Sequence, residues 1–183
     1  MARKRKIIVY IATSADGFIA RPDGSVDWLD RPHPKGNYGM GAFYKSIDTI
    51  LWGRKTYDVA LEFQKKGGSA FDTKLKNYVF TRNLGKPQAP AGVELVNAPI
   101  KAFANHLQLQ KGKDIWMMGG AGVIASFLDE GKIDEFMIHV VPKFIGEGIP
   151  LIAPRHRNVP LKLISCAQFS DGVVKLHYVV RQH

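Results

Sequence analysis

The residues best suited to chemistry lie at a glycine-rich junction in residues 114–123. Four apolar residues in a row, 115–118, are typical of a buried strand, and three of the next four residues are glycines (Gly119, Gly120 and Gly122), followed by an apolar segment typical of a helix. Such a junction exposes backbone N–H groups at the positive end of a helix, where an anion can approach without meeting a Cβ atom. The junction therefore predicts an anion site, and a glycine turn used only for close packing is the alternative.

Two further segments, residues 51–57 and 79–82, end a strand in groups that suit an anion. The first places Gly53 before two cations and a hydroxyl in the first turn of a helix, where cations are unfavourable unless an anion binds there. The second ends in Thr81 and Arg82, and a guanidinium can hold a phosphate monoester through two hydrogen bonds. Because ligands bind outside the carboxyl ends of strands in open α/β sheets, the three segments are predicted to share one crevice. Surface solubility and an ordinary polar loop remain alternatives for each segment alone.

The elements that must position these groups alternate between strand and helix patterns. We predict strands over residues 7–12, 49–52, 78–81, 93–96, 135–141, 161–169 and 173–180, besides the strand before Gly119, and helices over 39–46, 55–63, 98–109 and 123–128. The last two strands flank Ser170, Asp171 and Gly172, which is a hairpin signal. This order predicts an α/β protein whose central sheet is mostly parallel and closes with an antiparallel edge hairpin at the C-terminus.

The composition limits the classes of function. The 183 residues suffice for one sizeable core, so residues 1–183 are expected to form a single domain. A net charge of +10 favours phosphorylated partners, whereas no apolar run approaches the ~20 residues that span a bilayer. Cys166 is the single cysteine, which fits a reducing cytoplasm. The basic residues 3–6 are interpreted as a solvated end before the first strand, with a nucleic-acid arm as the alternative.

Five motifs in a fixed order carry a family resemblance. They cover residues 14–20, 23–29, 51–57, 79–82 and 116–123, and together they resemble the dihydrofolate-reductase-like superfamily. Within it, the chain is most similar to the branch that contains the C-terminal reductase domain of the bifunctional riboflavin-biosynthesis deaminase/reductase, which residues 140–151 also resemble. The resemblance implies a three-layer fold with helices on both faces of the sheet.

The same resemblance implies NADPH as cofactor and assigns residues to it. By similarity, the pyrophosphate and adenosine side would be held by Gly53, Arg54, Lys55 and Thr56, the 2′-phosphate by Thr81 and Arg82, the pyrophosphate and nicotinamide by Gly119, Gly120, Ala121, Gly122 and Val123, and the nicotinamide also by Ala12 and Ile19. Binding of the 2′-phosphate would select NADPH over NADH.

Two departures from the family pattern limit the reaction. Dihydrofolate reductases carry a carboxylate on the first helix, whereas the matching residues 36–40 contain none, so folate reduction is not expected. The deaminase half of the riboflavin enzyme needs paired cysteines for zinc, and a single cysteine excludes that chemistry. No histidine spacing indicates a metal site.

The proton donor is the least determined part of the site. Asp27 beside Trp28 is our preferred pair, because the aromatic ring could stack on a heterocycle and raise the carboxyl pKa by desolvation. Asp16 and Phe43 are further candidates for contact with the substrate. Backbone hydrogen bonding is the alternative for the aspartates, and a place in the core is the alternative for Phe43. His139 is interpreted as a satisfied histidine of the sheet.

These observations predict a cytoplasmic NADPH-dependent oxidoreductase acting on a small, possibly phosphorylated heterocycle by direct hydride transfer. The resemblance suggests 5-amino-6-(5-phosphoribosylamino)uracil as substrate and a homodimer formed through the C-terminal strands. One alternative is a non-catalytic nucleotide- or nucleic-acid-binding protein, for which a continuous basic stripe with aromatics is missing. Another is a dihydrofolate reductase-type enzyme without the helix carboxylate. We expect neither a membrane nor a nucleic acid as partner.

Overall fold

The computed structural model describes residues 3–30, 34, 36–67, 72–84 and 90–181. Within these ranges no helix is both long enough and apolar enough to cross a membrane. The strands are β1 (Ile7–Ser14), β2 (Phe18–Ala20), β3 (Ile47–Gly53), β4 (Lys76–Phe80), β5 (Val93–Val96), β6 (Asp114–Gly119), β7 (Glu135–Val141), β8 (Ile149–Pro150), β9 (Leu161–Gln168) and β10 (Val174–Val180). The helices are α1 (Met40–Ser46), α2 (Arg54–Lys65), α3 (Ile100–Leu109) and α4 (Ala121–Asp129), with short 3-10 helices at η1 (Asp27–Leu29) and η2 (Asn37–Gly39).

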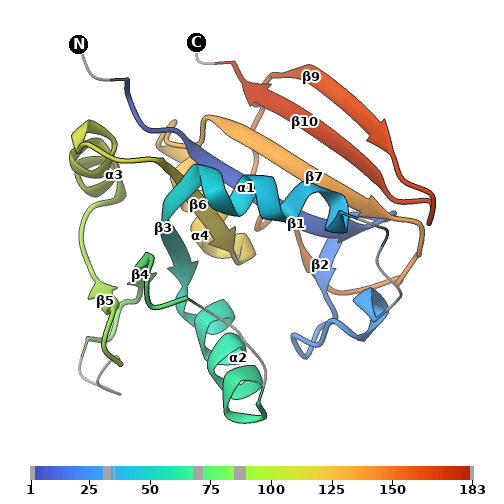
Figure 1. The fold of residues 1–183 in the computed structure, drawn as a ribbon, viewed down its shortest axis with the longest axis horizontal. Coiled ribbons are helices and arrows are strands. Elements are labelled where there is room, and N and C mark those ends of the chain that lie inside the picture. The colour runs from blue at the N-terminus through green and yellow to red at the C-terminus, as the bar shows by residue number, and fades with distance from the viewer. Residues whose placement is uncertain (1–2, 31–33, 35, 68–71, 85–89, 182–183) are drawn as a thin grey trace.

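The central sheet has eight strands in the order β5-β4-β3-β6-β1-β7-β10-β9 (Figure 1). The pairs from β5 through β7 are all parallel, whereas β10 pairs antiparallel with both β7 and β9. The mostly parallel sheet with an antiparallel C-terminal hairpin is therefore confirmed. Because β3, β4, β6 and β1 run in the same direction, their carboxyl ends meet at one edge of the sheet, where ligands of such folds bind.

Helices cover both faces of this sheet, as predicted. Apolar residues of α3 and α4, among them Leu107 and Phe127, pack on one face against Val9 and Met117. On the other face Phe43 of α1 and Tyr57 of α2 pack against alternate residues of the same strands, such as Trp116. The alternation of neighbours such as Val9 and Tyr10 between the two clusters follows from the two-residue period of a strand.

The element boundaries differ from the predicted ones in ways that matter at the site. The strand predicted over residues 7–12 continues to Ser14, because β1 keeps its parallel register with β7 up to Ser14 and Val141. The helix predicted to begin at Val123 begins two residues earlier, at Ala121, directly after Gly120. The predicted strand over 78–81 ends at Phe80, so Thr81 lies outside it. The two-stranded β2–β8 sheet was not predicted, since strands of three and two residues show no periodicity.

The basic residues at the N-terminus are engaged by acids of the sheet and do not form a free arm. Arg5 is 1% exposed, and its guanidinium donates to the Asp48 carboxylate, to Thr49 Oγ1 at 2.7 Å and to the Lys113 carbonyl at 2.5 Å. Arg3 pairs with Asp114 at 2.8 Å while its side chain stays 61% exposed. The ion pairs of these residues support the interpretation of residues 3–6 as the entry to the first strand.

We expect Arg5→Ala to lower the free energy of unfolding by about 3 kcal/mol, because the substitution leaves Asp48 and Thr49 without their buried partner. Arg3→Ala is the matched control and should cost less than about 1 kcal/mol, since its ion pair is exposed. Urea denaturation of both variants measures the difference. Equal losses would contradict the buried role of Arg5.

Candidate active site

Two of the three predicted junctions meet at the carboxyl edge of the sheet. A Cβ atom placed on Gly53 would lie 3.1 Å from the Gly120 nitrogen and 3.3 Å from the Gly119 carbonyl oxygen. A Cβ on Gly120 would lie 2.8 Å from Thr56 Oγ1. The Gly119–Gly120 peptide bond is cis. These distances mean that a Cβ atom on Gly53 or Gly120 would force its neighbours to shift, because the ends of β3 and β6 approach each other so closely.

The helices that follow these glycines begin without side-chain caps. Gly53 is the N-cap of α2 and Gly120 is the N-cap of α4, and neither helix start has a side-chain cap hydrogen bond or an acidic residue in its first turn. The first backbone N–H groups of a helix have no partner inside the helix. Two sets of such donors thus face the same edge of the sheet, which is a suitable arrangement for the phosphates of a dinucleotide.

The side chains at the start of α2 differ in their hydrogen-bond partners and in their exposure. Arg54 donates from Nε to Asp58 Oδ1 at 2.8 Å, one helical turn further along, so this cation is already paired within the helix. Lys55 is exposed, and Thr56 is partly buried against Gly120. Lys55 and Thr56 therefore present groups to a ligand more directly than Arg54 does.

The third predicted segment lies beside the first two. Phe80, the last residue of β4, is the register partner of Gly53, so Thr81 and Arg82 leave the sheet next to α2. Thr81 donates its backbone N–H to the Val96 carbonyl at 3.0 Å and accepts the Asn83 N–H on Oγ1 at 3.1 Å. This turn holds the exposed Arg82 at the same edge as both glycine junctions. The structure thus brings all three segments together.

The remaining predicted cofactor residues surround the glycines. Ile19 on β2 reaches to 4.0 Å from a Cβ position on Gly120, and Ala12 on β1 lines the adjoining pocket. In the first turn of α4, Ala121 is buried and accepts the Ala153 N–H at 3.2 Å. A Cβ atom on Gly122 would meet open space, whereas Val123 packs against Gly53.

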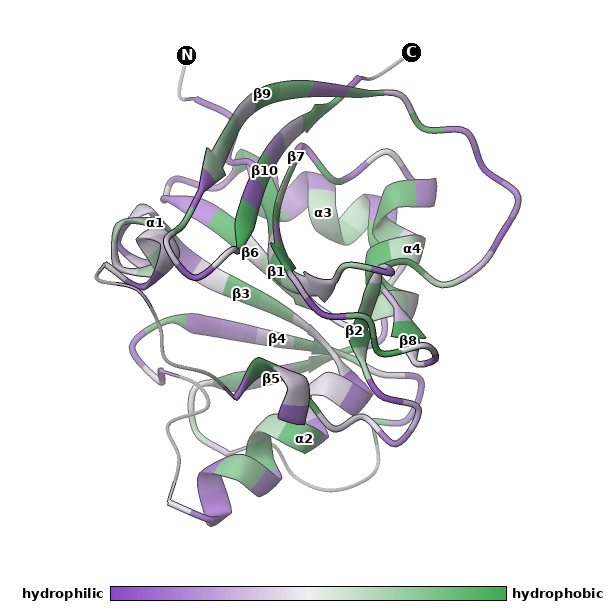
Figure 2. Cartoon of the chain, turned by 90° about the vertical axis from the view of Figure 1, so that its right-hand side faces the viewer, coloured by the Kyte–Doolittle hydropathy of each residue, from purple (hydrophilic) through white to green (hydrophobic). Residues whose placement is uncertain are grey.

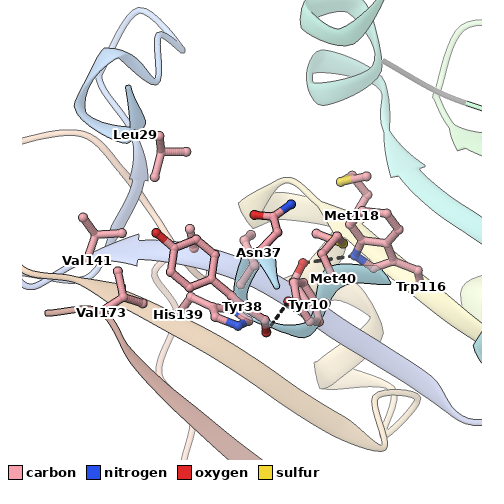
Figure 3. Close-up of a pocket in the computed structure, with 12 residues that line it drawn as sticks. Tyr10, Leu29, Asn37, Tyr38, Met40, Trp116, Met118, His139, Val141 and Val173 are labelled. Carbon is pink, nitrogen blue, oxygen red and sulfur yellow. Dashed lines mark hydrogen bonds between the residues drawn. The ribbon is translucent and has the colours of Figure 1, made fainter. Parts of the chain in front are cut away.

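A pocket of about 390 Å³ adjoins this edge on the α1 side of the sheet (Figure 3). Leu29, Val141 and Val173 lie toward one end, and Met40, Trp116 and Met118 toward the other. The described lining residues are Tyr10, Ile11, Ala12, Leu29, Asn37, Tyr38, Met40, Trp116, Met118, His139, Val141 and Val173, with no carboxylate among them. Only Ala12 of this set was predicted. Tyr10 could have been predicted from Ala12, because residues two apart on a strand share a face.

The pocket contains a buried histidine of the sheet. His139 is 4% exposed and its ring lies near the backbone of Ile11 and Tyr38, whereas its Nε2 has no hydrogen-bond partner among the described residues. Burial lowers its pKa to about 4, and the nearby Lys175 charge acts in the same direction. The imidazole stacks obliquely on Tyr10, with ring centroids 4.5 Å apart. His139 therefore lines the pocket as a neutral group.

Tyr10 and Tyr38 complete the polar part of the pocket. The Tyr10 hydroxyl donates to the Tyr38 carbonyl at 3.2 Å, and burial raises the pKa of Tyr10 to about 12. The Tyr38 hydroxyl donates to Asp171 at the tip of the β9–β10 hairpin. Residues 36–40, which match the segment that carries the carboxylate in dihydrofolate reductases, thus supply part of the pocket wall through Asn37, Tyr38 and Met40.

The predicted pair of Asp27 and Trp28 does not have the geometry expected of it. The Asp27 side chain is 60% exposed and accepts two hydrogen bonds from Arg21, at 2.6 and 3.1 Å. These bonds lower its pKa, where a raised pKa was expected. Trp28 is 2% exposed and packs with Val141 and Val173, so its ring has no free face for a heterocycle. Neighbours on a 3-10 turn point in different directions, which separates the two side chains.

Asp16 accepts hydrogen bonds from the backbone and so joins two loops, which was the alternative to contact with the substrate. Its carboxylate accepts the Ser14 hydroxyl at 2.5 Å and the N–H groups of Ile145 at 3.1 Å and Gly146 at 2.8 Å. These hydrogen bonds lower its pKa, Ser14 having the largest effect. Phe43 is 6% exposed and stacks on Tyr10 at a centroid distance of 4.4 Å, so it supports the pocket from the core. Neither residue is among those that line the pocket.

The fold, with its glycine-rich edge beside an apolar pocket, is that of the dihydrofolate-reductase-like class. The chain belongs to the family described as the RibD C-terminal domain, whose model matches residues 5–175. It is 40% identical over 179 residues to the uncharacterized protein YwjB of Bacillus subtilis, covering 96% of this chain and 98% of that one.

Three of the solved structures that resemble the chain illustrate its relationships. A putative riboflavin biosynthesis protein from Shewanella sp. PV-4 has a TM-score of 0.82 and 27% identity, over 97% of this chain and 99% of that one. A diaminohydroxyphosphoribosylaminopyrimidine deaminase/5-amino-6-(5-phosphoribosylamino)uracil reductase from Thermotoga maritima has a TM-score of 0.71 and 17% identity, over 97% and 57%. Dihydrofolate reductase from Enterococcus faecalis, complexed with NADP(H) and RAB-propyl, has a TM-score of 0.68 and 14% identity, over the whole of both chains. The last two show the fold alone.

Protonation of His139 should make the protein lose stability between pH 7 and pH 4. Its folded pKa of about 4 lies below the ordinary 6.5, so the unfolded chain binds more protons in this range and stability falls as pH falls. The whole effect corresponds to roughly 3 kcal/mol. Urea unfolding of wild type and His139→Gln at several pH values isolates this contribution, because other groups titrate alike in both. Identical pH slopes would contradict it.

Proposed function

We propose that the protein is an NADPH-dependent reductase of a small heterocycle, most similar in reaction to 5-amino-6-(5-phosphoribosylamino)uracil reductase, and that residues 1–183 act as one domain in the cytoplasm. The observation that carries the proposal is the contact between the glycine-rich edge and the pocket. Met118, which lines the pocket, directly precedes Gly119, and Ile11 of the pocket reaches to 3.7 Å from a Cβ position on Gly119. A cofactor on the edge would therefore lie beside a substrate in the pocket. The exposed, unpaired thiol of Cys166 suits a reducing compartment.

The edge fits a dinucleotide with a 2′-phosphate. The uncapped N–H groups at Gly53 and Gly120 supply donors for the pyrophosphate. Arg82, which is exposed at the same edge, supplies a cation for the 2′-phosphate. Because a Cβ atom on either glycine would meet protein atoms of the neighbouring junction, the two glycines let the two helix starts lie side by side at this edge.

The chemistry follows from this arrangement. When bound, NADPH supplies a hydride from C4 of its nicotinamide, which the heterocycle accepts at carbon. Ala12 lines the pocket with only a methyl group, so it would leave the nicotinamide room to approach a substrate there. The apolar walls formed by Trp116, Met118 and Leu29 exclude water from the reacting atoms. The chain thus acts mainly by alignment and exclusion of solvent.

We expect Arg82→Ala to weaken NADPH binding by about tenfold or more while leaving NADH binding within about twofold, because the lost guanidinium contacts only the 2′-phosphate. Titrations that follow nicotinamide fluorescence measure both constants. Arg181→Ala is the control, since Arg181 is an exposed arginine at the end of β10, away from the cofactor edge.

Equal effects on the binding of both cofactors would contradict a contact between Arg82 and the 2′-phosphate. Failure of the wild type to bind either cofactor, together with salt-sensitive binding to an oligonucleotide, would favour a non-catalytic nucleic-acid-binding protein. A screen of heterocycles with NADPH oxidation as readout then identifies the reaction, with the riboflavin intermediate and dihydrofolate as its first two compounds.

We also propose that two copies of the chain pair through β9. This strand forms the outer edge of the sheet (Figures 1 and 2). All of its residues are exposed. Its apolar residues Leu161, Leu163 and Ile164 are 42%, 50% and 49% exposed. An exposed edge with free backbone groups and apolar side chains is a surface that proteins usually cover, and a second copy of β9 offers the same pairing groups in return.

We expect Leu163→Glu to raise the dimer dissociation constant by about tenfold or more, because a charge would be buried between the two strands. Leu109→Glu is the matched control, since Leu109 is 81% exposed at the end of α3. Analytical ultracentrifugation over a range of concentrations measures both. A wild-type protein that stays monomeric at all concentrations would contradict the proposed dimer.

A further inference from the structure

The turn before α1 has an uncommon backbone conformation. Its four residues all have positive φ angles: Gly36 (87°), Asn37 (44°), Tyr38 (57°) and Gly39 (85°). Glycine adopts this left-handed conformation freely and asparagine does so more readily than most residues, whereas for a bulky residue such as Tyr38 it is an outlier. Such a conformation persists only where surrounding contacts hold it, and it is concentrated at functional sites. The turn is therefore a candidate part of the substrate site.

Tyr38 holds this turn against the rest of the protein. Its carbonyl accepts the Tyr10 hydroxyl at 3.2 Å, and its own hydroxyl donates to Asp171 on the β9–β10 hairpin. Its ring packs edge-on against that of Phe169, with centroids 5.1 Å apart. Because these contacts fix Tyr38 from both the sheet and the hairpin, the adjacent Asn37 has a defined position.

Asn37 brings a carboxamide to the pocket. The residue is exposed and is one of those that line the pocket, and Figure 3 draws its carboxamide among the lining side chains. A carboxamide presents one acceptor, Oδ1, and two donors on Nδ2 side by side. It therefore matches a ligand edge on which a donor and an acceptor are also adjacent, whereas a carboxylate at this position would offer acceptors alone.

The described lining of the pocket provides no counter-charge for an ion. It includes no carboxylate, lysine or arginine. Its buried titratable groups are uncharged near neutral pH, since burial lowers the pKa of His139 to about 4 and raises that of Tyr10 to about 12. Lys175 lies near the Tyr10 ring, with Nζ 5.5 Å from its centroid, but is not a lining residue. A charged ring would therefore lose hydration here without gaining an ion pair.

Resting on the reductase function proposed above, we propose that Asn37 determines specificity for an uncharged planar heterocycle that carries a ring N–H group beside a ring carbonyl, a lactam edge. The ring N–H donates to Asn37 Oδ1, and the ring carbonyl accepts from Nδ2–H. The apolar side chains of Leu29, Trp116 and Met118 accommodate the faces and the remaining edges of the ring. Anionic and protonated rings are rejected because the pocket does not compensate their charge.

Four heterocycles test the proposal at pH 6. Lumazine is an uncharged fused pyrimidinedione with the lactam edge, and 1,3-dimethyllumazine has methyl groups in place of both N–H groups of that ring. Orotate is the anion and 2,4-diaminopyrimidine the cation. Isothermal titration, with saturating NADP⁺ and again without it, should give lumazine the tightest binding. The dimethyl derivative should bind about tenfold more weakly or worse, because its complex leaves the hydrogen bonds of the carboxamide unmade.

Two substitutions of Asn37 preserve the turn and change only what it offers. Asn37→Asp has nearly the same shape and tolerates the same φ. It replaces the donor by an acceptor, so it should weaken lumazine by about tenfold or more and strengthen 2,4-diaminopyrimidine by about threefold or more. Asn37→Gly also permits the positive φ but has no carboxamide. In this variant lumazine and its dimethyl derivative should differ by less than about threefold, which separates hydrogen bonding from the size of the methyl groups.

Asn105→Asp is the matched control. It makes the same change at an exposed position of α3, which covers the opposite face of the sheet, and should leave all four affinities unchanged.

Equal binding of lumazine and its dimethyl derivative, tighter binding of either charged ring, no binding of lumazine, or unchanged affinities in Asn37→Asp would each overturn the proposal. Parallel fluorescence titrations with NADPH distinguish this failure from that of the reductase function. If NADPH binds but Asn37→Asp changes no affinity, the reductase stands and the role of Asn37 falls. If Asn37→Asp shifts the affinities as expected but NADPH does not bind, the role of Asn37 stands without the reductase.

Discussion

At the carboxyl ends of β3 and β6, two helices begin within van der Waals contact of each other, and the space between them excludes any side chain. A Cβ on Gly53 would lie 3.1 Å from the Gly120 nitrogen, and one on Gly120 would lie 2.8 Å from Thr56 Oγ1. This approach sets the distance between two uncapped helix starts, and with it the spacing of the donors that a dinucleotide would meet. The parallel register of β3 with β4 then brings Thr81 and Arg82 to the same edge.

The pocket depends on a second set of contacts, made on the α1 face of the sheet. Tyr10 is its centre, because it stacks on Phe43, contacts His139 and binds the Tyr38 carbonyl. The β9–β10 hairpin closes the far side through Asp171, which holds the Tyr38 hydroxyl. A pocket built this way is mostly apolar, and its polar lining comes from Tyr10, Asn37, Tyr38 and His139, so its selectivity rests on few polar atoms.

The loops around the site are fixed to one another by Asp16. Its carboxylate binds the N–H groups of Ile145 and Gly146, and the Ala15 N–H donates to the Lys143 carbonyl at 2.8 Å. The segment after β1 and the segment after β7 are therefore tied together beside Ala12 and Ile19, the residues expected at the nicotinamide. A carboxylate that looks suited to catalysis in the sequence serves here to hold the loop that carries Ile19.

The sequence by itself determined the fold class and the glycine-rich edge, because both follow from local patterns of residues. Apolar runs followed by glycine mark strand ends, and parallel strands bring their ends together whatever the rest of the chain does. Only the tertiary structure decided the pocket. Asp27 and Trp28 are adjacent in sequence, yet one binds Arg21 at the surface and the other is buried. The position of His139 in a strand predicts a buried face, whereas its unpartnered Nε2 and its nearness to Lys175 depend on loops and strands far away in sequence. Burial and hydrogen-bond satisfaction are properties of the neighbours that folding supplies, and no local pattern contains them.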